Sequence, residues 1–430
     1  MMNLNVDDFS CLKSASFQVA PVTVLIGPQG SGKSVLCKLN YFFWDLLARQ
    51  HKFAESGAEI AEFKRDVARQ FRTWFPPAAW GQKRFNITFA AGPYTARILR
   101  RMSKGSVADD VSVTLSGFFE TQYSDLRTAY TELSASDARE DRGLLRRSIE
   151  SGFRIRDRYD RVMTKEMEDL YVNFQMFFPA GRAFFTSMGR LVAAMKQASS
   201  LDPVTVTFAE VFANLRDFSR TRFISALEND DSNAARQKIM LDLFGGEIKF
   251  ERELEYVQTN DGRRIPFTAL SSGQQELLPM WTLVDYFSRL TRGRPDAKEI
   301  FYIEEPEAHL FPTAQSILMD FLVGTLVSRQ KKRDLVITTH SPYILAKINN
   351  YLKAGHIGRN RRLSDQVEKI VSKDCWLTND VLKAYAIEDG RLKDLIDDEG
   401  LISAYYIDKV SEEVSDTFEK LLDLQYPETA

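Results

Sequence analysis

A short glycine-rich segment between an apolar run and a helical pattern constrains this fold more than any other feature. The run Val22–Ile26 is apolar and rich in β-branched residues, and Pro21 and Gly27 bound it, as is typical of a strand buried on both faces. After the glycines, apolar side chains recur at helical spacing at Val35, Leu36, Leu39, Phe42, Phe43, Leu46 and Leu47. The sequence therefore predicts a strand, a loop and a helix in close succession, within an α/β fold.

The loop has the pattern of a phosphate-binding loop. Its residues Gly27-Pro28-Gln29-Gly30-Ser31-Gly32-Lys33-Ser34 fit G-x-x-x-x-G-K-[ST]. The glycines let successive backbone N–H groups point at phosphate oxygens, and the following helix adds its positive N-terminal end. Lys33 is then expected to reach the β- and γ-phosphates of ATP, and the Ser34 hydroxyl to ligate Mg²⁺. The alternative is a plain turn between strand and helix.

A second apolar run ends in two acidic residues. The strand-like Ile300–Ile303 is followed by Glu304 and Glu305. Because removing charge from water is costly, two carboxylates at the end of a buried strand favour a cation or a chemical role. We expect Glu304 to hold Mg²⁺, usually through water, and Glu305 to polarise the attacking water. The alternative is an exposed strand end. Glu304 departs from the more usual aspartate and is one methylene longer.

The segment Leu270–Glu276 precedes a helical pattern and carries two serines. Ser271 or Ser272 can cap that helix, so a plain N-cap is one interpretation. The stretch also resembles the ABC signature LSSGQ. In that superfamily the signature is followed along the chain by the strand that bears the paired acids, as it is here. There the signature serine, the glycine backbone and the helix N-terminus contact the γ-phosphate bound to the opposite subunit. The resemblance implies nucleotide contacts from Ser271, Ser272, Gly273 and Gln274.

Two further segments resemble RecF-like, SMC-like and overcoming-lysogenization-defect-type ABC ATPases. One is Glu304–Pro312, which reads E-E-P-E-A-H-L-F-P and includes His309. The other is Thr338–Pro342, which resembles the switch-histidine segment of these proteins. In that context His340 is expected to donate to the γ-phosphate and to sense its loss, whereas His309 is either functional or structural. The resemblance covers roughly residues 1–45 and 245–350 and implies an ATPase whose two copies sandwich ATP.

The chain is expected to form an ABC-type P-loop head, in which a mixed sheet is flanked by helices and joined by an antiparallel β subdomain. Residues 1–50 and 245–400 form the split head, 50–118 a β-rich part with strands near 85–89, 94–99 and 111–115. Residues 119–244 are predicted to be a mainly helical insertion with a strand at 172–178, Gly143 and Gly152 being candidate helix breaks. Residues 400–430 are predicted to end in a helix, and Asn260–Gly262 marks a hairpin turn.

Several arginines have two interpretations each. Arg182 follows Phe178–Gly181 in a segment that resembles defence-associated members, where ABC proteins usually carry a glutamine loop. It could face the nucleotide or partner subunit, or form a structural ion pair. A basic cluster could contact DNA phosphate or an acidic partner, or form a solvated helix face because acids are interleaved; it comprises Arg146, Arg147, Arg154, Arg156, Arg158 and Arg161. The run Arg359, Arg361 and Arg362 has the same ambiguity.

Composition narrows the classes of function. The 430 residues are 44% hydrophobic and 27% charged with a net charge of -2, so any nucleic-acid surface must be local. The three cysteines form no close pair, and neither a secretory signal nor a long apolar span is present, which favours a cytoplasmic protein without a membrane partner.

The resemblance favours an ATPase subunit of an antiphage defence module, similar to those of Septu, PARIS and retron-linked systems. Such a homodimer, or a larger assembly of such dimers, would act with a separately encoded nuclease or toxin. The alternative is a RecF-like repair or maintenance ATPase that binds DNA directly.

Overall fold

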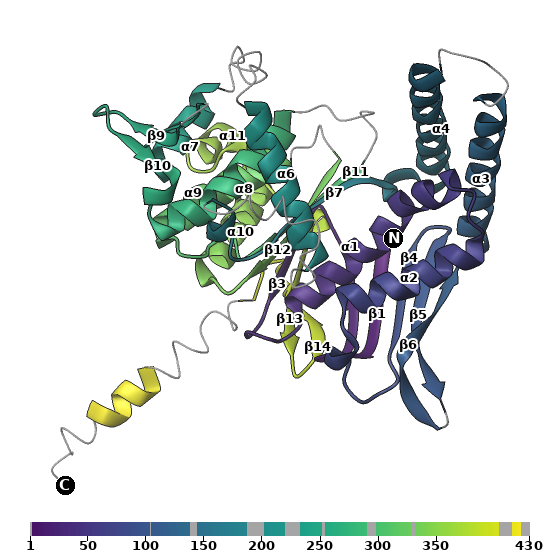
Figure 1. The fold of residues 1–430 in the computed structure, drawn as a ribbon. Helices are drawn as coiled ribbons and strands as arrows, with labels where there is room; N and C mark the ends of the chain where they lie inside the picture. Colours follow the sequence, from purple (N-terminus) through teal and green to yellow (C-terminus); the bar gives the residue numbers. More distant parts are fainter. Residues whose placement is uncertain are drawn as a thin grey trace, which may run out of the picture.

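An open sheet of mixed strand direction runs through the protein (Figure 1). The computed structural model describes residues 2–103, 105–137, 144–186, 202–219, 233–251, 254–289, 298–327, 332–403 and 415–422. Within these residues the sheet has eleven strands in the order β6-β5-β4-β1-β2-β14-β13-β3-β12-β11-β7. Their bounds are β1 Met2–Phe9, β2 Leu12–Phe17, β3 Val22–Ile26, β4 Asn86–Ala91, β5 Tyr94–Ser103, β6 Ser106–Leu115, β7 Val172–Phe178, β11 Lys298–Glu304, β12 Arg333–Thr339, β13 Leu382–Glu388 and β14 Arg391–Asp394.

One half of the sheet is parallel and buried on both faces. Strands β13, β3, β12, β11 and β7 all run in the same direction. Alternate residues supply two separate cores: Leu25, Val336 and Tyr302 point into one, whereas their chain neighbours point into the other. The first core is covered by α1 (Lys33–Glu55), and the second by α6 (Pro203–Ser219), α8 (Ser272–Arg289), α9 (Pro312–Leu326) and α10 (Pro342–Ile357). This two-sided burial explains the continuous apolar runs of the sequence.

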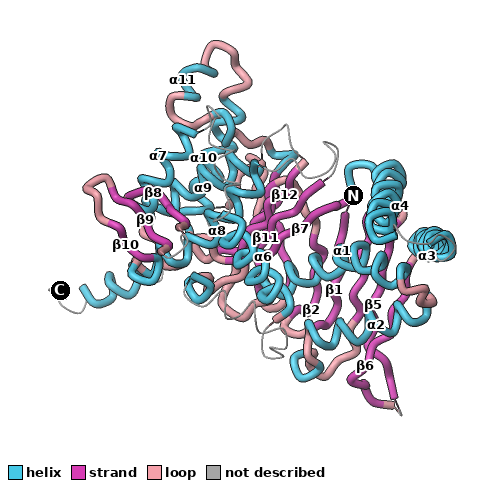
Figure 2. Tube along the Cα trace, turned by 45° about the horizontal axis from the view of Figure 1, so that its top comes forward, coloured by secondary structure: helices cyan, strands magenta, loops and turns pink. Residues whose placement is uncertain are grey.

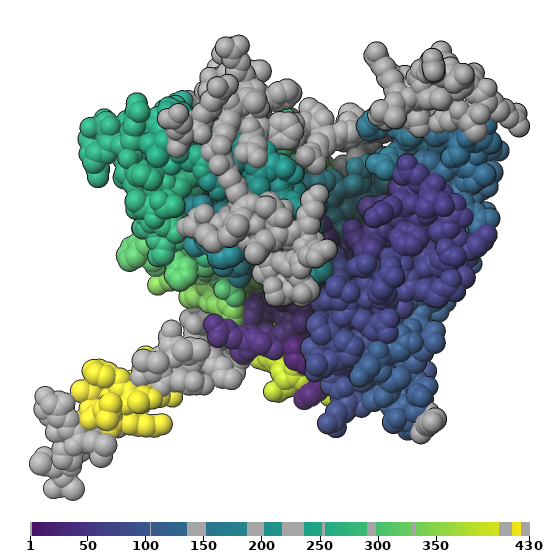
Figure 3. Space-filling model, viewed as in Figure 1, coloured from purple at the N-terminus to yellow at the C-terminus, as the bar shows by residue number. Residues whose placement is uncertain are grey.

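The other half of the sheet is antiparallel and has one buried face. Strands β4, β5 and β6 form a meander that joins β1 and β2, which confirms the three strands predicted between residues 85 and 115. Helices α1, α2 (Ile60–Trp74) and α3 (Gly117–Asp137) cover it (Figure 2). Aromatic rings fill this interface; Phe43 of α1, for example, stacks on Phe89 of β4 at 5.3 Å between centroids. In the space-filling view, the purple and blue residues of this half lie on the opposite side of the molecule from the green surface (Figure 3).

Two long helices form a projection above the antiparallel half (Figure 1). They are α3 and α4 (Leu144–Met167), and the interpretation of Gly152 as a helix break is wrong, because α4 continues through it. An interior glycine costs about 1 kcal/mol relative to alanine. The burial of Tyr159, Met163 and Met167 in the first core offsets this cost. Gly143 lies outside the described residues.

The remaining elements complete the second core and its surface. A separate antiparallel sheet contains β8 (Gly246–Phe250), β9 (Glu255–Thr259) and β10 (Arg264–Pro266), with the predicted turn at 260–262 between β9 and β10. Helices α7 (Asn233–Phe244) and α11 (Ser364–Glu368) lie in the same part of the chain's fold (Figure 2). The helix predicted near the end of the chain falls partly outside the description, which gives 415–422 as helical. Among the described helices, none is both long enough and apolar enough to cross a membrane.

Candidate functional site

Four sequence motifs meet at one edge of the parallel half-sheet. Residues 27–32 follow β3, Glu304 ends β11, His340 follows β12, and residues 179–182 follow β7. The strands are parallel and in register, with Thr339 opposite Ile26 and Glu304 opposite Thr338. Their carboxyl ends therefore meet at a common edge, which is where open α/β sheets bind ligands. The parallel alignment of the strands thus brings together segments that are up to about 300 residues apart in the chain.

The glycine-rich loop needs its glycines at two close contacts. Gly27 has φ +155°, and a Cβ there would lie 2.9 Å from Ser31 Oγ and 3.1 Å from the carbonyl oxygen of Ile387. Gly32 has φ +111°, and its Cβ would lie 2.7 Å from a methyl carbon of Leu12 in the β1–β2 hairpin. The loop is therefore curled tightly against β2 and β13. The side chains at its tip, Pro28 and Gln29, are exposed.

Lys33 is the first residue of α1, and its ammonium lies inside the loop. Nζ donates to the carbonyl oxygens of Gly27 at 2.7 Å and Pro28 at 2.9 Å. Burial lowers the pKa of Lys33, and the carboxylates of Glu305, Glu307 and Glu304 oppose this shift. A positive charge is therefore held between the loop and a group of acids. Ser34 follows on the exposed side of the same helical turn.

The two acids at the end of β11 have different environments. Glu304 is buried; its Oε2 accepts from the N–H of Ala180 at 3.2 Å, and its Oε1 has no hydrogen-bond partner among the described residues. Glu305 is 38% exposed, and its Oε1 lies 3.4 Å from Nε2 of His340. Its backbone has φ +42°, although its N–H still donates to Thr338 at 2.9 Å. Such a conformation in a non-glycine residue costs about 1–3 kcal/mol, and strained residues of this kind cluster at active sites.

A third acid, Glu307, holds the histidine segment in place, a role not predicted for it from the sequence. Its Oε1 accepts from the Thr339 hydroxyl and from the backbone N–H of His340, both at 2.7 Å. The other carboxylate oxygen of Glu307 is buried and has no hydrogen-bond partner in the part of the chain that the structure describes. Glu307 thus ties the turn after β11 to the end of β12. The sequence feature that could have indicated this role is the position of Glu307 as the third acid of the E-E-P-E run.

The serine-rich segment before α8 forms a capping box. The Ser271 hydroxyl accepts from the N–H of Gln274 at 3.3 Å, and the Ser271 N–H donates to Oε1 of Gln274 at 3.2 Å. Ser271 is therefore the cap, which leaves Ser272 exposed at the first helical position. Gly273 is buried, and a Cβ there would lie 2.6 Å from the carbonyl oxygen of His309. The segment packs in this way against the connection between β11 and α9.

The Arg182 side chain has no exposed surface. Of the two interpretations of this residue, the structure therefore has the structural ion pair. Its Nε lies 3.7 Å from Oε2 of Glu276 in α8, and its other donors bind backbone carbonyls. The interpretation that its side chain faces nucleotide or a partner is therefore wrong.

Among the described side chains, no group of three His, Cys, Asp or Glu residues could hold a metal by itself. Mg²⁺, however, usually keeps several waters and takes only one or two protein oxygens together with phosphate oxygens. The Ser34 hydroxyl and the Glu304 carboxylate fit that requirement, because Oε1 of Glu304 is a buried acceptor to which no described residue donates.

The arginine clusters stay on the surface. In α4 the described arginines Arg154, Arg156, Arg158 and Arg161 are exposed, and Arg161 pairs with Asp157 at 2.6 Å. This pairing fits a solvated helix face. The side chains of Arg146 and Arg147 lie outside the described part. Arg359, Arg361 and Arg362 are also exposed.

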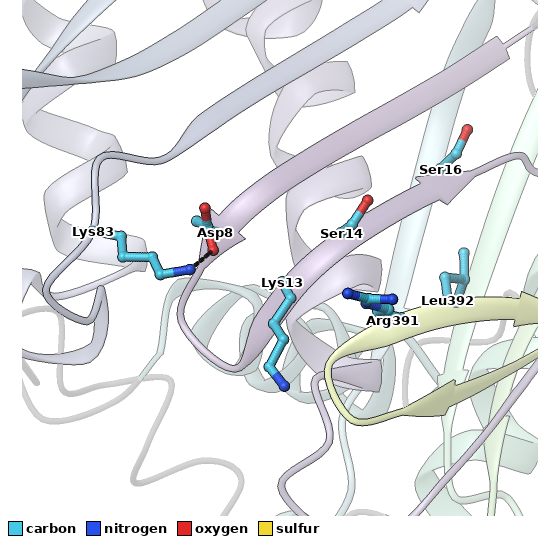
Figure 4. A pocket seen from close by; sticks show the side chains of 7 residues that line it. All are labelled: Asp8, Lys13, Ser14, Ser16, Lys83, Arg391 and Leu392. Atoms are coloured by element: carbon cyan, nitrogen blue, oxygen red, sulfur yellow. Dashed lines mark hydrogen bonds and ion pairs between the residues drawn. The ribbon is translucent and has the colours of Figure 1, made fainter.

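A pocket of about 550 Å³ lies beside the β1–β2 hairpin (Figure 4). Its lining includes Lys13, Lys83 and Arg391 together with Ser14 and Ser16. Asp8 also lines it and pairs with Lys83 at 2.6 Å. The pocket therefore carries an excess of positive charge on the same edge of the sheet as the glycine-rich loop.

Comparison with known proteins agrees with a nucleotide-dependent enzyme. Residues 196–345, about a third of the chain, match the family described as the AAA ATPase domain. No curated protein matches the chain.

Among solved structures, an SMC head bound to the C-terminal winged-helix domain of ScpA is 12% identical with a TM-score of 0.38, over 91% of this chain and 95% of that one. The SMC head of Thermotoga maritima is 14% identical with a TM-score of 0.34, over 91% and 97%. A nucleotide-bound RecF structure is 9% identical with a TM-score of 0.29, over 92% and 98%.

Proposed function

We propose that the chain is an ATPase that binds ATP at residues 27–34 and hydrolyses it when two copies enclose the nucleotide. The observation that carries this proposal is the convergence of the loop, the Glu304–Glu305 pair and His340 at one sheet edge. The match of residues 196–345 to the AAA ATPase domain family also supports it; that segment contains Glu304, Glu305 and His340 but not the loop.

The loop and α1 bind the triphosphate. Backbone N–H groups of the loop and the positive end of α1 contact phosphate oxygens. The Lys33 ammonium leaves the carbonyls of Gly27 and Pro28 to reach the β- and γ-phosphates, a charge-assisted contact. Ser34 and Glu304 would hold Mg²⁺, which would neutralise charge on the phosphate oxygens.

Glu305 is the general base. Its carboxylate takes a proton from the attacking water while the water oxygen bonds to the γ-phosphorus and the bond to the ADP oxygen breaks. His340 lies beside Glu305 at 3.4 Å and is fixed through its backbone by Glu307. It can therefore orient the base and contact the γ-phosphate from the neighbouring strand end.

The second half of the site comes from another copy. The first N–H groups at the start of α8 lack helical partners, and the capping box satisfies only those of Ser271 and Gln274. Ser272 and the N-terminal end of α8 thus present a hydroxyl and a positive dipole at the surface. A γ-phosphate bound to a second copy supplies the matching negative charge.

The substitution Ser272→Arg tests the dimer because Ser272 is exposed and its change should leave the fold intact. We expect ATP binding to a single copy to persist, ATP-dependent dimerisation to disappear, and kcat to fall about 10²-fold, the usual worth of one preorganised donor at developing charge. Light scattering with and without ATP and steady-state hydrolysis measure these effects. Gln366→Arg, on the exposed helix α11, is the matched control. Wild-type turnover by Ser272→Arg would refute the shared site.

We further propose that the ATP-dependent dimer controls a separately encoded nuclease or toxin in antiphage defence. The resemblance of Glu304–Pro312 to defence-associated ATPases supports this step. The second candidate is direct DNA binding, which the pocket around Lys13, Lys83 and Arg391 favours.

One experiment separates these two functions. The chain is expressed with the product of its neighbouring reading frame, and separately mixed with DNA. A defence role predicts co-purification with a nuclease or toxin, and hydrolysis that bare DNA does not change. Direct binding predicts DNA-stimulated hydrolysis that Lys13→Glu/Arg391→Glu weakens, with a shallower salt dependence of DNA affinity. DNA stimulation without any partner would overturn the defence role.

A further inference from the structure

Arg182 joins three parts of the candidate site from inside the protein. Its Nη1 donates to the carbonyl oxygens of Pro179, after β7, at 2.9 Å and of Glu304, at the end of β11, at 2.6 Å. Its Nη2 donates to the carbonyl oxygen of Glu305 at 3.0 Å. Its Nε donates to the carbonyl oxygen of Glu276 in α8 at 3.2 Å. One planar group thus contacts two strand ends and a helix.

A buried guanidinium is an expensive way to make a purely structural tie. Taking a charge out of water costs several kcal/mol, and apolar packing of equal volume is often as stable. Burial lowers the pKa of Arg182, and the carboxylate of Glu276 is the largest influence opposing this shift. What the guanidinium adds is rigidity, since its donors lie in one fixed plane. A movement of α8 therefore reaches both strand ends.

At the β11 end, Arg182 holds the backbone that aims Glu305. Its two contacts are the carbonyls of Glu304 and Glu305, on either side of the torsion φ of +42°. That torsion is unfavourable for glutamate and persists only where neighbouring contacts enforce it. The direction of the Glu305 carboxylate is therefore sensitive to the position of the guanidinium.

At the α8 end, the same segment grips the first turns of the helix. The Arg182 N–H donates to Oε2 of Glu276 at 2.7 Å, and the Thr186 hydroxyl donates to the carbonyl of Gln275 at 2.7 Å. Glu276 lies one turn after Ser272, at the start of the same rigid helix. Any shift of the exposed end of α8 is transmitted to Glu276 and so to Arg182.

We propose that Arg182 is a positioning residue that couples the two ATP sites of the dimer. When Ser272 and Gly273 contact the nucleotide of the other copy, α8 shifts, and Glu276 and Arg182 turn Glu305 toward the water at their own site. This inference rests on the proposed function. It makes each site efficient only when its own copy is engaged across the interface, so hydrolysis is cooperative in ATP.

The test uses a double substitution, Arg182→Gln/Glu276→Gln, which replaces the ion pair by two amides. Removing Arg182 alone would strand a buried carboxylate and destabilise the fold. We expect unchanged ATP affinity, a kcat about tenfold lower, as a typical coupling implies, and a Hill coefficient for hydrolysis that is closer to 1 than the wild-type value, because ATP-dependent dimerisation keeps part of the cooperativity. Arg182→Lys, which keeps the charge, should recover part of the kcat.

The outcomes separate the possibilities. A lower melting temperature with unchanged kcat and Hill coefficient would make Arg182 structural only and overturn the coupling. A wild-type Hill coefficient of 1 would also overturn it. Glu305→Gln is measured in parallel: if it hydrolyses ATP normally, the proposed function fails, whereas slow Glu305→Gln with unaltered double variant rejects only the coupling.

Discussion

Glu305→Gln should bind ATP as well as the wild type or better, yet hydrolyse it about 10²–10⁴-fold more slowly, which is the usual contribution of a general base. An amide has nearly the shape of the carboxylate but cannot take the proton of the attacking water. The Glu305 carboxylate, just after β11, is partly exposed and lies beside His340, and it forms no buried ion pair with any described residue, so the fold should tolerate the change.

Affinity should not fall, because the substitution removes a negative charge close to the place where phosphates bind. Glu305 is the strongest of the carboxylates that act on Lys33. Equilibrium binding of ATP and single-turnover hydrolysis measure the two effects separately. Glu368→Gln, an exposed position on α11, is the matched control. Hydrolysis by Glu305→Gln near the wild-type rate would remove Glu305 as the base.

Lys33→Ala should weaken ATP binding about 10²-fold, since a hydrogen bond to a charged group contributes about 1.5–3 kcal/mol. The ammonium lies within the loop and is surrounded by carboxylates, so its loss also leaves those acids to repel the phosphates. Titration calorimetry with ATP measures the affinity.

A loss of loop structure could also weaken binding, because Nζ donates to two carbonyls of the loop. Lys33→Arg separates the two effects, because it keeps the positive charge but is too bulky to make the same contacts with the loop. If the charge matters, Lys33→Arg should bind ATP more tightly than Lys33→Ala. Lys369→Ala, an exposed lysine, is the control. Equal ATP affinity in Lys33→Ala and the wild type would contradict the phosphate-loop interpretation.

Local signals predicted the parts of the site that lie on single segments. The order strand, glycine loop and helix depends on periodicity and steric freedom within about twenty residues, and the structure has β3 and α1 where that order predicts them. The strand at 300–303 is predicted from its apolar run for the same reason, and it lies within β11.

The parts of the site that could not be predicted from the sequence depend on contacts between residues far apart in the chain. The bond between Arg182 and Glu276 joins residues 94 positions apart, and no local pattern indicates which of many arginines will be buried. Glu307 was inside a recognised run, but its hold on His340 depends on how β11 and β12 align. Gly152 shows the converse, since packing of α4 overrides a weak local preference.

The alternation along β3 has a consequence for how this protein can be altered. Leu25 faces one core and Ile26 the other, and the glycine-rich loop begins at the next residue. Substitutions that repack either core will shift the base of that loop. Variants selected for a higher melting temperature through changes in one core should therefore also differ from the wild type in nucleotide affinity. A ligand bound at that loop would in turn stabilise the packing on both faces of the sheet.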